Sequence, residues 1–422
     1  MMYYVLSLFL LTYILMLVFP KYKAYIAFIM AFFFLVLGII DIDDFFKEID
    51  FNILLMIGGT MGTVSLFIES KMPSKLSDII IDKTSTVKWM TIALPLFAGV
   101  ISAFVDNVAT VLMIAPVALE LAKDLKINPV PILISISIFS NLEGAATLVG
   151  DTTAIMLASK MNLDFLDFFF YDGKIGLFFI VQIGLLASAL ILLFLERKSN
   201  KLTLSKKHTV VHDYVPTMLL VLTIISLIVA SFIPNKPDLT NGIICLVYFV
   251  IGLIIKFMKT KDFSSLLDNI KEIDYETLLL LASLFVIIGG IKEAGVIDAI
   301  GNIITSFNSD SIILLYTVIV FASVIISAFV DNIPYVATML PVIATIGTKL
   351  GIDPTMLYYG LIIGATLGGN FTPIGASANI ASIGILKKHD YEVSNGEYFK
   401  RSIPISLAAI LTGYIVVLIM YI

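Results

Sequence analysis

Two Asp-Asn pairs lie in stretches that are otherwise apolar enough for a membrane. The string Ser102-Ala-Phe-Val-Asp-Asn107 returns 225 positions later as Ser327-Ala-Phe-Val-Asp-Asn332. A carboxylate at the centre of a bilayer costs roughly 2.5–3.5 kcal/mol on insertion scales, so it is a functional hypothesis by default. A carboxylate beside an amide offers oxygen ligands to a hard cation such as Na+, or a site for a proton. The predicted ligands of a coupling ion are Asp106, Asn107, Asp331 and Asn332.

Further polar residues follow in the same apolar segments. Glu143 and Asp151 are the other two ionisable residues at predicted membrane depth. The hydroxyl and amide side chains predicted to complete an ion or substrate site are Ser102, Ser327, Asn141, Thr147, Asn370, Thr372, Ser377 and Asn379. No Lys or Arg falls within these segments, so we expect acids without a basic partner.

Each acid also has a structural interpretation. Asp106 and Asp331 could cap helices that begin at hairpin turns, because Asp and Asn are favoured at helix starts. The duplication of the pair at membrane depth favours function, and capping and ion binding can coexist. Glu143 could equally be a buried acid paired with an amide.

Glycine and proline explain how backbone oxygen becomes available near these side chains. The strings Gly144–Gly150 and Gly364–Gly375, the second with Pro373, interrupt helices that would otherwise span a membrane. Interrupted helices leave carbonyl and amide groups without intrahelical partners. Helix N-termini at such breaks can face an anion, and helix C-termini can face a cation.

The spacing of 224 or 225 residues holds over the chain and divides it into two copies of one unit. Ile49-Asp50-Phe51 matches Ile273-Asp274-Tyr275, and Thr147 matches Thr372. Such repeats are typical of secondary transporters, with the substrate site between the repeats. Each copy contains five predicted crossings, and an odd number inverts the second copy relative to the first.

We therefore predict an all-α polytopic membrane protein with two inverted-topology repeats, about ten transmembrane helices, two re-entrant helical hairpins and two broken helices. The first repeat is residues 1–195, with a hairpin at 90–121 and a broken helix at 130–158. The second is residues 214–422, with a hairpin at 311–346 and a broken helix at 355–385. The remaining helices are expected at about 3–19, 24–40, 51–69, 174–195, 214–232, 240–257, 274–292 and 402–421.

Composition assigns the chain to the lipid bilayer. Hydrophobic residues make up 59% of the 422 residues, charged residues 14%, and the mean hydropathy is +1.03; soluble domains carry roughly 25% charge. A net charge of −5 gives no basic face for nucleic acid, and the single Cys245 allows no internal disulfide. The apolar start of the chain lacks a basic leader, so we expect a retained first helix.

Basic residues predict the orientation. Most of the 27 Lys and Arg residues fall in loops on one side of the predicted topology, including the basic linker at 196–213. By the positive-inside rule this side is cytoplasmic, which puts both termini outside the cytoplasm in a multi-pass cell (inner) membrane protein. The first hairpin then enters from the cytoplasm and the second from the other side.

Four strings carry a resemblance to a known family. Ser102–Pro116, Ser327–Pro341, Asn141–Ile155 and Gly364–Ile380 resemble the ArsB/NhaD permeases of the ion transporter superfamily, which include arsenite exporters, Na+/H+ antiporters and P protein. The resemblance implies an elevator-type carrier, commonly a homodimer, with ions held at the two hairpin tips. One departure concerns the first broken helix, where Asp151-Thr-Thr-Ala154 replaces the family's usual Asp-Pro-Pro-Asn.

The sequence thus predicts a secondary active transporter of small ions, not an enzyme, that needs no cofactor beyond Na+ or H+ as coupling ion. Cation/proton antiport is the leading hypothesis, with Asp106 and Asp331 exchanging a proton for a cation. The alternative is a Na+- or H+-coupled carrier of arsenite, a carboxylate or another small oxyanion, held by helix N-termini. An intramembrane aspartyl protease is disfavoured, because Gly150-Asp151 lacks the Gly-x-Gly-Asp form. A passive channel stays an alternative, although duplicated broken helices favour alternating access.

Overall fold

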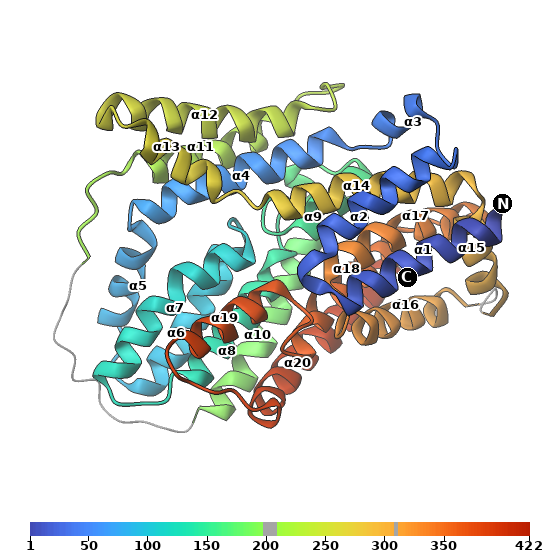
Figure 1. The fold of residues 1–422 in the computed structure, drawn as a ribbon. Helices are drawn as coiled ribbons and strands as arrows, with labels where there is room; N and C mark the ends of the chain where they lie inside the picture. The colour runs from blue at the N-terminus through green and yellow to red at the C-terminus, as the bar shows by residue number, and fades with distance from the viewer. Residues whose placement is uncertain (197–208, 308–310) are drawn as a thin grey trace.

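The computed structural model describes residues 1–196, 209–307 and 311–422 (Figure 1). The helices of the first copy are α1 (Met2–Val18), η1 (Pro20–Tyr22), α2 (Lys23–Val36), α3 (Ile42–Lys47), α4 (Phe51–Glu69), α5 (Met72–Asp82), α6 (Val87–Ser102), α7 (Asn107–Asp124), α8 (Val130–Gly144), α9 (Thr152–Met161), η2 (Phe165–Phe168) and α10 (Leu177–Leu195). Two short antiparallel strands, β1 (Phe170–Tyr171) and β2 (Lys174–Ile175), precede α10.

The second copy repeats this order. Its helices are α11 (Val215–Ala230), α12 (Thr240–Thr260), α13 (Phe263–Lys271), α14 (Tyr275–Glu293), α15 (Val296–Phe307), α16 (Ile312–Ser327), α17 (Asn332–Leu350), α18 (Thr355–Gly368), η3 (Gly369–Phe371), α19 (Ser377–Lys388) and α20 (Asn395–Tyr421). Helices α6 and α16 end at matching serines, and α7 and α17 begin at matching asparagines. The chain is an all-α polytopic membrane protein built from two inverted repeats. Most of the expected linker at 196–213 lies outside the described residues.

Six helices in the described part of the chain are long and apolar enough to cross a membrane alone: α4, α10, α12, α14, α17 and α20. Helices α1 and α2 pass this test only together and are bent by 115°. The expected helix at 24–40 is corrected here: α2 ends at Val36, and Gly38 with φ of +64° turns the chain away. A positive φ is readily adopted by glycine, so a helix ending before it is the expected outcome.

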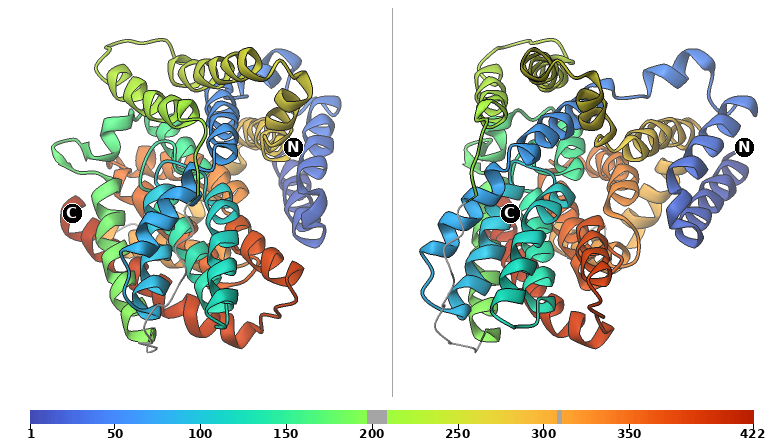
Figure 2. Two further views of the ribbon diagram at one scale, coloured as in Figure 1. Left: turned by 90° about the vertical axis from the view of Figure 1, so that its left-hand side faces the viewer. Right: turned by 60° about the vertical axis from the view of Figure 1, so that its left-hand side comes forward.

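The helices form two groups, which we call the scaffold (α1–α4 and α11–α14) and the bundle (α5–α10 and α15–α20). Figure 1 shows α4, α11, α12, α13 and α14 along the top, and Figure 2 shows α1 and α2 on the outer side next to α14. Helix α12 packs on α4, and α2 packs on α14, so each repeat contributes helices to the other's half of the scaffold. Glycines allow this close packing: a Cβ on Gly59 would lie 2.5 Å from the backbone of Cys245.

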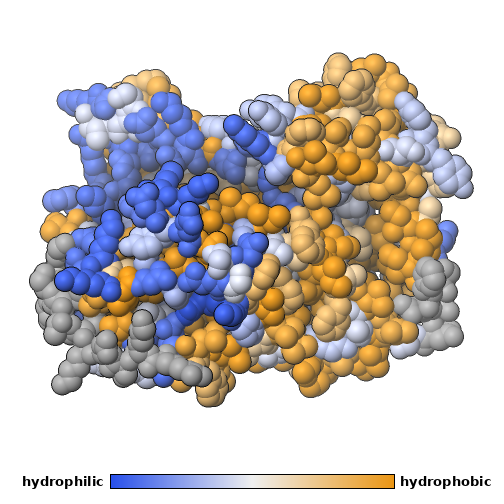
Figure 3. Space-filling view, turned by 60° about the horizontal axis from the view of Figure 1, so that its bottom comes forward, coloured by the Kyte–Doolittle hydropathy of each residue, from blue (hydrophilic) through white to orange (hydrophobic). Residues whose placement is uncertain are grey.

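The broken helices form the centre of the bundle. All residues of α18 are buried, as are nearly all of α8. Helices α6 and α16 pack against them, and α10 packs against α20 between the repeats. Large apolar side chains elsewhere are exposed over a broad part of the surface, next to a hydrophilic region (Figure 3). An exposed apolar surface of this extent is typical of a protein that contacts lipid.

Candidate functional site

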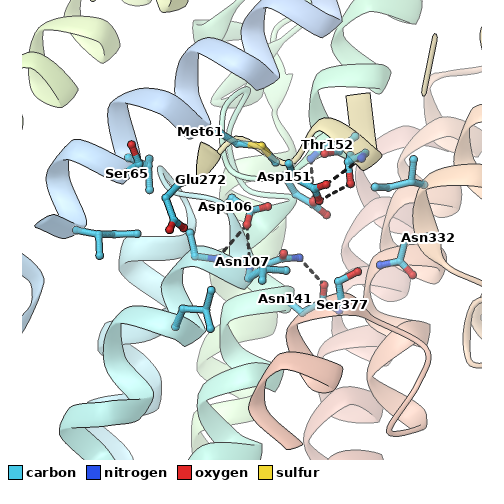
Figure 4. A pocket seen from close by; sticks show the side chains of 18 of the residues that line it. Met61, Ser65, Asp106, Asn107, Asn141, Asp151, Thr152, Glu272, Asn332 and Ser377 are labelled. Atoms are coloured by element: carbon cyan, nitrogen blue, oxygen red, sulfur yellow. Dashed lines mark hydrogen bonds between the residues drawn. The ribbon is translucent and has the colours of Figure 1, made fainter. Parts of the chain in front are cut away.

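The tips of the two hairpins meet at one cavity. It has a volume of about 160 Å³ and is lined by residues of α4, α7, α8, α9, α14, α17 and α19 (Figure 4). Its acidic lining residues are Asp106, Asp151, Glu272, Asp274 and Asp331. Asn107, Asn141, Asn332 and Ser377 add neutral polar groups, so oxygen-bearing side chains from both repeats share one space with Asp106.

Asp106 occupies the turn between α6 and α7. Its Oδ2 accepts hydrogen bonds from the backbone N–H groups of Val108 and Ala109, both at 3.0 Å, so it caps α7. The capping interpretation and a place in the cavity therefore hold together for this residue. Within the described residues, no Lys or Arg pairs with Asp106, and its half-buried carboxylate faces the cavity (Figure 4).

Asp331 makes the equivalent cap but has a different environment. Its Oδ1 accepts from the backbone N–H of Ile333 at 3.2 Å, and its Oδ2 forms an ion pair with Lys23. The expectation that the membrane acids lack a basic partner is therefore wrong at Asp331. The reason is the bend between α1 and α2, which brings the first residue of α2 to the tip of the second hairpin.

Asp151 has no counterpart in the second repeat. It caps α9 by accepting from the backbone N–H of Thr152 at 2.8 Å and from the Thr153 hydroxyl at 3.0 Å. The matching helix α19 begins after Ala376, which provides no side-chain cap. At this pair of matching helices the first repeat therefore contributes a capping carboxylate to the cavity, and the second contributes a helix start without a side-chain cap.

Asparagines connect the two broken helices. The amide of Asn107 donates to Asn141 Oδ1 at 3.0 Å, and the amide of Asn141 donates to Thr366 O at 2.7 Å and Asn370 Oδ1 at 3.0 Å. Asn370 in turn donates to the carbonyl of Ile138 at 3.2 Å. Asn141 is therefore the link between the first hairpin tip and the second repeat.

Asn141→Ala is expected to lower the free energy of unfolding by at least about 2 kcal/mol. It leaves buried partners unpaired on Asn107, Thr366 and Asn370, and each unsatisfied buried group costs roughly 1–3 kcal/mol. Thermal unfolding of the purified protein in detergent measures the change. Asn395→Ala, at an exposed position, is the control. Equal melting temperatures for the two variants would contradict this role of Asn141.

The two hairpins are fastened to the broken helices in the same way. The Thr147 hydroxyl donates to the carbonyl of Ala103, and the Thr372 hydroxyl donates to the carbonyl of Ala328. A Cβ on Gly150 would lie 2.5 Å from the Gly144 carbonyl oxygen, and a Cβ on Gly375 would lie 2.6 Å from that of Gly369. Only glycine fits at these two positions, and its absent side chain lets backbone carbonyl oxygens gather beside each tip.

The remaining predicted residues divide into supporting groups. Ser140 donates to Ser102 Oγ at 3.0 Å, and Ser327 donates to the carbonyl of Ala365. Asn379 donates to the carbonyl of Gly369 at 3.1 Å, with its own Oδ1 buried and unpaired. Ser327, Thr147, Thr372 and Asn379 therefore bind backbone carbonyls near the tips, Ser102 contacts the Ser140 side chain, and none of the five lines the cavity.

Glu143 lies apart from the cavity. Its side chain is fully buried and accepts a hydrogen bond from Gln182 of α10 at 2.5 Å. This arrangement matches its structural interpretation, an acid paired with an amide, and the prediction that it shares the site is corrected. Helical spacing explains the result: Glu143 and Asn141 are two residues apart on α8 and so point to different sides.

Several cavity residues were not singled out from the sequence. Met61 and Ser65 of α4, Thr277 of α14 and the acids Glu272 and Asp274 line the cavity, and Lys23 reaches Asp331. Asp274 does lie in the repeated Ile-Asp-aromatic string, which is the one sequence signal that pointed to it.

The donor set suits an alkali cation or a proton better than a transition metal. Among the residues that the structure describes, no three His, Cys, Asp or Glu side chains are grouped to hold a metal ion. The available ligand atoms are carboxylate, amide and backbone oxygens, which are hard ligands. A cation at the first tip would be held by Asp106 with neutral oxygens, Asn107 among them.

Known proteins with similar sequences or folds are membrane transporters. The model of a family described as CitMHS, citrate transporter, matches residues 13–364. The uncharacterized transporter Rv2685 of Mycobacterium tuberculosis is 28% identical over 394 residues, with 91% of this chain and 90% of that protein covered. The P protein of Sus scrofa is 28% identical over 459 residues, with 89% of this chain and 53% of that protein covered. The YdaH transporter of Alcanivorax borkumensis has a similar structure, with a TM-score of 0.59 at 13% identity over 89% of this chain and 86% of that one.

Proposed function

The chain belongs to the citrate transporter family CitMHS and is a secondary transporter, and we propose that it exchanges a cation, Na+ or another, for protons. Membership in the ion transporter superfamily confirms the resemblance inferred from the hairpin and broken-helix strings. The family is one of transporters, not enzymes.

The charge of the cavity supports a cation as the transported species. Five acids line it, and the ion pair between Lys23 and Asp331 is the basic contact that the described residues make to them. A narrow space lined by one sign of charge and walled by apolar helices concentrates ions of the opposite sign. The same negative field would repel a free di- or tricarboxylate.

Asp106 is the proposed exchange residue. A bare carboxylate is costly inside a low-dielectric protein, whereas a carboxylate neutralised by a proton or a cation is not. The bundle would move when Asp106 carries a proton or a cation, and it would not move when Asp106 carries neither. This condition would couple the cation flux to the opposite proton flux. Backbone carbonyls near Gly150 and the amide of Asn107 would complete the coordination of the cation.

A second cavity supports alternating access. It has a volume of about 430 Å³, and part of its lining, from the helices that match α4 and the start of α14, corresponds to residues of the first cavity at a spacing of 224. Val64 and Ile68 correspond to Ile288 and Lys292, and Asp274 corresponds to Asp50. Inverted repeats put matching surfaces on opposite sides of a membrane. The two cavities would thus be the two entrances used in turn as the bundle slides along the scaffold in an elevator-type motion.

The location, oligomeric state and topology are also part of the proposal. From the distribution of basic residues and the family resemblance, we place the protein in the inner membrane as a homodimer, with both termini outside the cytoplasm. The first cavity, near the basic loops that contain Lys71 and Lys271, would then open to the cytoplasm. Each of the two repeats, residues 1–195 and 214–422, would contribute helices both to the moving bundle and to the scaffold.

One observation favours an anion carrier as the second candidate. Asp residues cap α7, α9, α14 and α17 at the cavity, but α19 begins after Ala376 without a side-chain cap. Ser377, its first residue, lines the cavity. Free N–H groups and the helix dipole make such a helix start a site for a carboxylate or oxyanion.

Ligand-induced thermal stabilisation separates the two candidates. A ligand that binds only the folded state stabilises it by about 2.7 kcal/mol at a concentration of one hundred times Kd. We expect the melting temperature of the purified protein to rise with NaCl relative to choline chloride, and to stay unchanged with choline citrate. A rise with citrate or arsenite and none with Na+, Li+ or K+ would overturn the cation proposal in favour of the anion carrier.

A further inference from the structure

The second hairpin tip already holds a cation supplied by the chain. The ammonium group of Lys23 forms an ion pair with Asp331 Oδ2. The side chain of Lys23 is 26% exposed and that of Asp331 is 24% exposed. Lys23 is the first residue of α2 in the scaffold, whereas Asp331 caps α17 in the bundle. The ion pair therefore joins the two groups of helices at the residue that matches Asp106.

Tyr13 makes a second contact between the same elements. Tyr13 is on α1, and its hydroxyl donates a hydrogen bond to the carbonyl of Pro334 at 2.6 Å. The same hydroxyl is also within hydrogen-bond distance of the Thr338 hydroxyl on α17. Pro334 is three residues from Asp331, so α1 and α2 together hold the tip of the second hairpin. The ion pair is thus one of several contacts between α1–α2 and the second hairpin tip, and not an isolated ion pair between two surface side chains.

The first hairpin tip has a different arrangement. Lys236 lies two residues after Pro234, between α11 and α12, and Lys23 lies three residues after Pro20, at the start of α2. Lys236, however, pairs with Asp164 in the loop after α9 and not with Asp106. Each repeat has a lysine near the connection of its first two helices, but of these two lysines the one in the first repeat reaches an Asp-Asn pair.

We propose that Lys23 is the resident counter-cation of Asp331, so that Asp106 takes up the transported cation while Asp331 takes up none. The inference rests on the proposed function, in which Asp106 binds the cation. Its physical basis is competition: one ammonium and one alkali cation cannot both occupy the Oδ2 side of a single carboxylate at contact distance. When one partner of a partly buried pair is removed, the other charge is left uncompensated. Without Lys23, Asp331 is expected to recruit a cation from solution.

Sodium-22 binding to the purified full chain tests the proposal. We expect about one sodium ion per chain for the wild type and about two for Lys23→Met, because Asp331 then offers a second oxygen site of the same type as Asp106. The double variant with Lys23→Met and Asp331→Asn should return to one. Lys21→Met removes an exposed lysine two residues away and should leave one.

Asp331→Asn keeps the test decisive if Lys23→Met does not fold. Asn retains the helix cap, and we expect one sodium ion per chain to remain bound at Asp106. Loss of sodium binding in Asp331→Asn, or an unchanged single site in folded Lys23→Met, would overturn the role of Lys23. A wild type that binds no cation would instead contradict the proposed function itself, so the two failures are distinguishable.

Discussion

Asp106→Asn is expected to abolish cation/proton exchange without unfolding the protein. Asn caps helices about as well as Asp, so the start of α7 keeps its hydrogen bonds to Val108 and Ala109. The substitution removes the charge that holds the cation and carries the proton. A charged contact is worth about 1.5–3 kcal/mol, or about 10- to 150-fold in cation affinity, and the proton exchange is lost altogether. Sodium-22 uptake by proteoliposomes under an outward proton gradient measures the rate.

A matched control separates this effect from a general change in charge. Asp268→Asn removes an acid from the exposed surface of α13, where it pairs with Lys271, and should leave uptake unchanged. The melting temperature of both variants should stay within a few degrees of the wild type, which is the expected range for small changes in stability. Turnover at the wild-type rate by Asp106→Asn would remove Asp106 from the mechanism.

Gly150→Ala and Gly375→Ala are expected to damage the protein severely although each adds a single carbon. A Cβ at Gly150 would lie 3.0 Å from the carbonyl oxygens of Ser102 and Ala103 and closer still to that of Gly144. At Gly375 the distances to the Ser327 and Ala328 carbonyl oxygens are 2.9 and 2.8 Å. Overpacking against backbone costs about 1–3 kcal/mol or more. Each variant should therefore lose transport, and its melting temperature should fall by several degrees.

Gly384→Ala is the control for these glycines. Gly384 lies within α19, and no atom lies within 4 Å of a Cβ built there. Replacing an open helical glycine by alanine is expected to stabilise the helix by up to about 1 kcal/mol. Similar loss of stability in Gly384→Ala and Gly150→Ala would show that helical context, and not the contact with carbonyl oxygens, decides the outcome.

The repeat made much of the architecture predictable from the sequence. An identical string at a fixed spacing implied matching turns, and α6, α7, α16 and α17 end and begin at the matching residues. Glycine and proline marked the breaks after Gly144 and near Pro373, because neither residue favours a continuous helix. The Asp-Asn pairs could be singled out as a candidate site because charged groups are rare at membrane depth, and both pairs line one cavity.

Other features depended on contacts that no local pattern records. Lys23 and Asp331 are 308 positions apart, and the bend between α1 and α2 that joins them follows no hydrophobic period. Glu143 shares a helix with Asn141, but packing against α10 gave it Gln182 as a partner. Glu272 and Asp274, next to the start of α14, were not singled out as site residues, and they line the cavity together with the first hairpin tip.

Cation-driven proton movement is the most direct test of the account. Wild-type protein in proteoliposomes that contain a pH-sensitive dye should alkalinise the interior when Na+, Li+ or K+ is added outside, because each entering cation is exchanged for protons that leave. Choline should produce no change. A dye signal that stays flat with every cation, together with uptake of labelled citrate or arsenite, would contradict cation/proton exchange and assign the cavity to an anion.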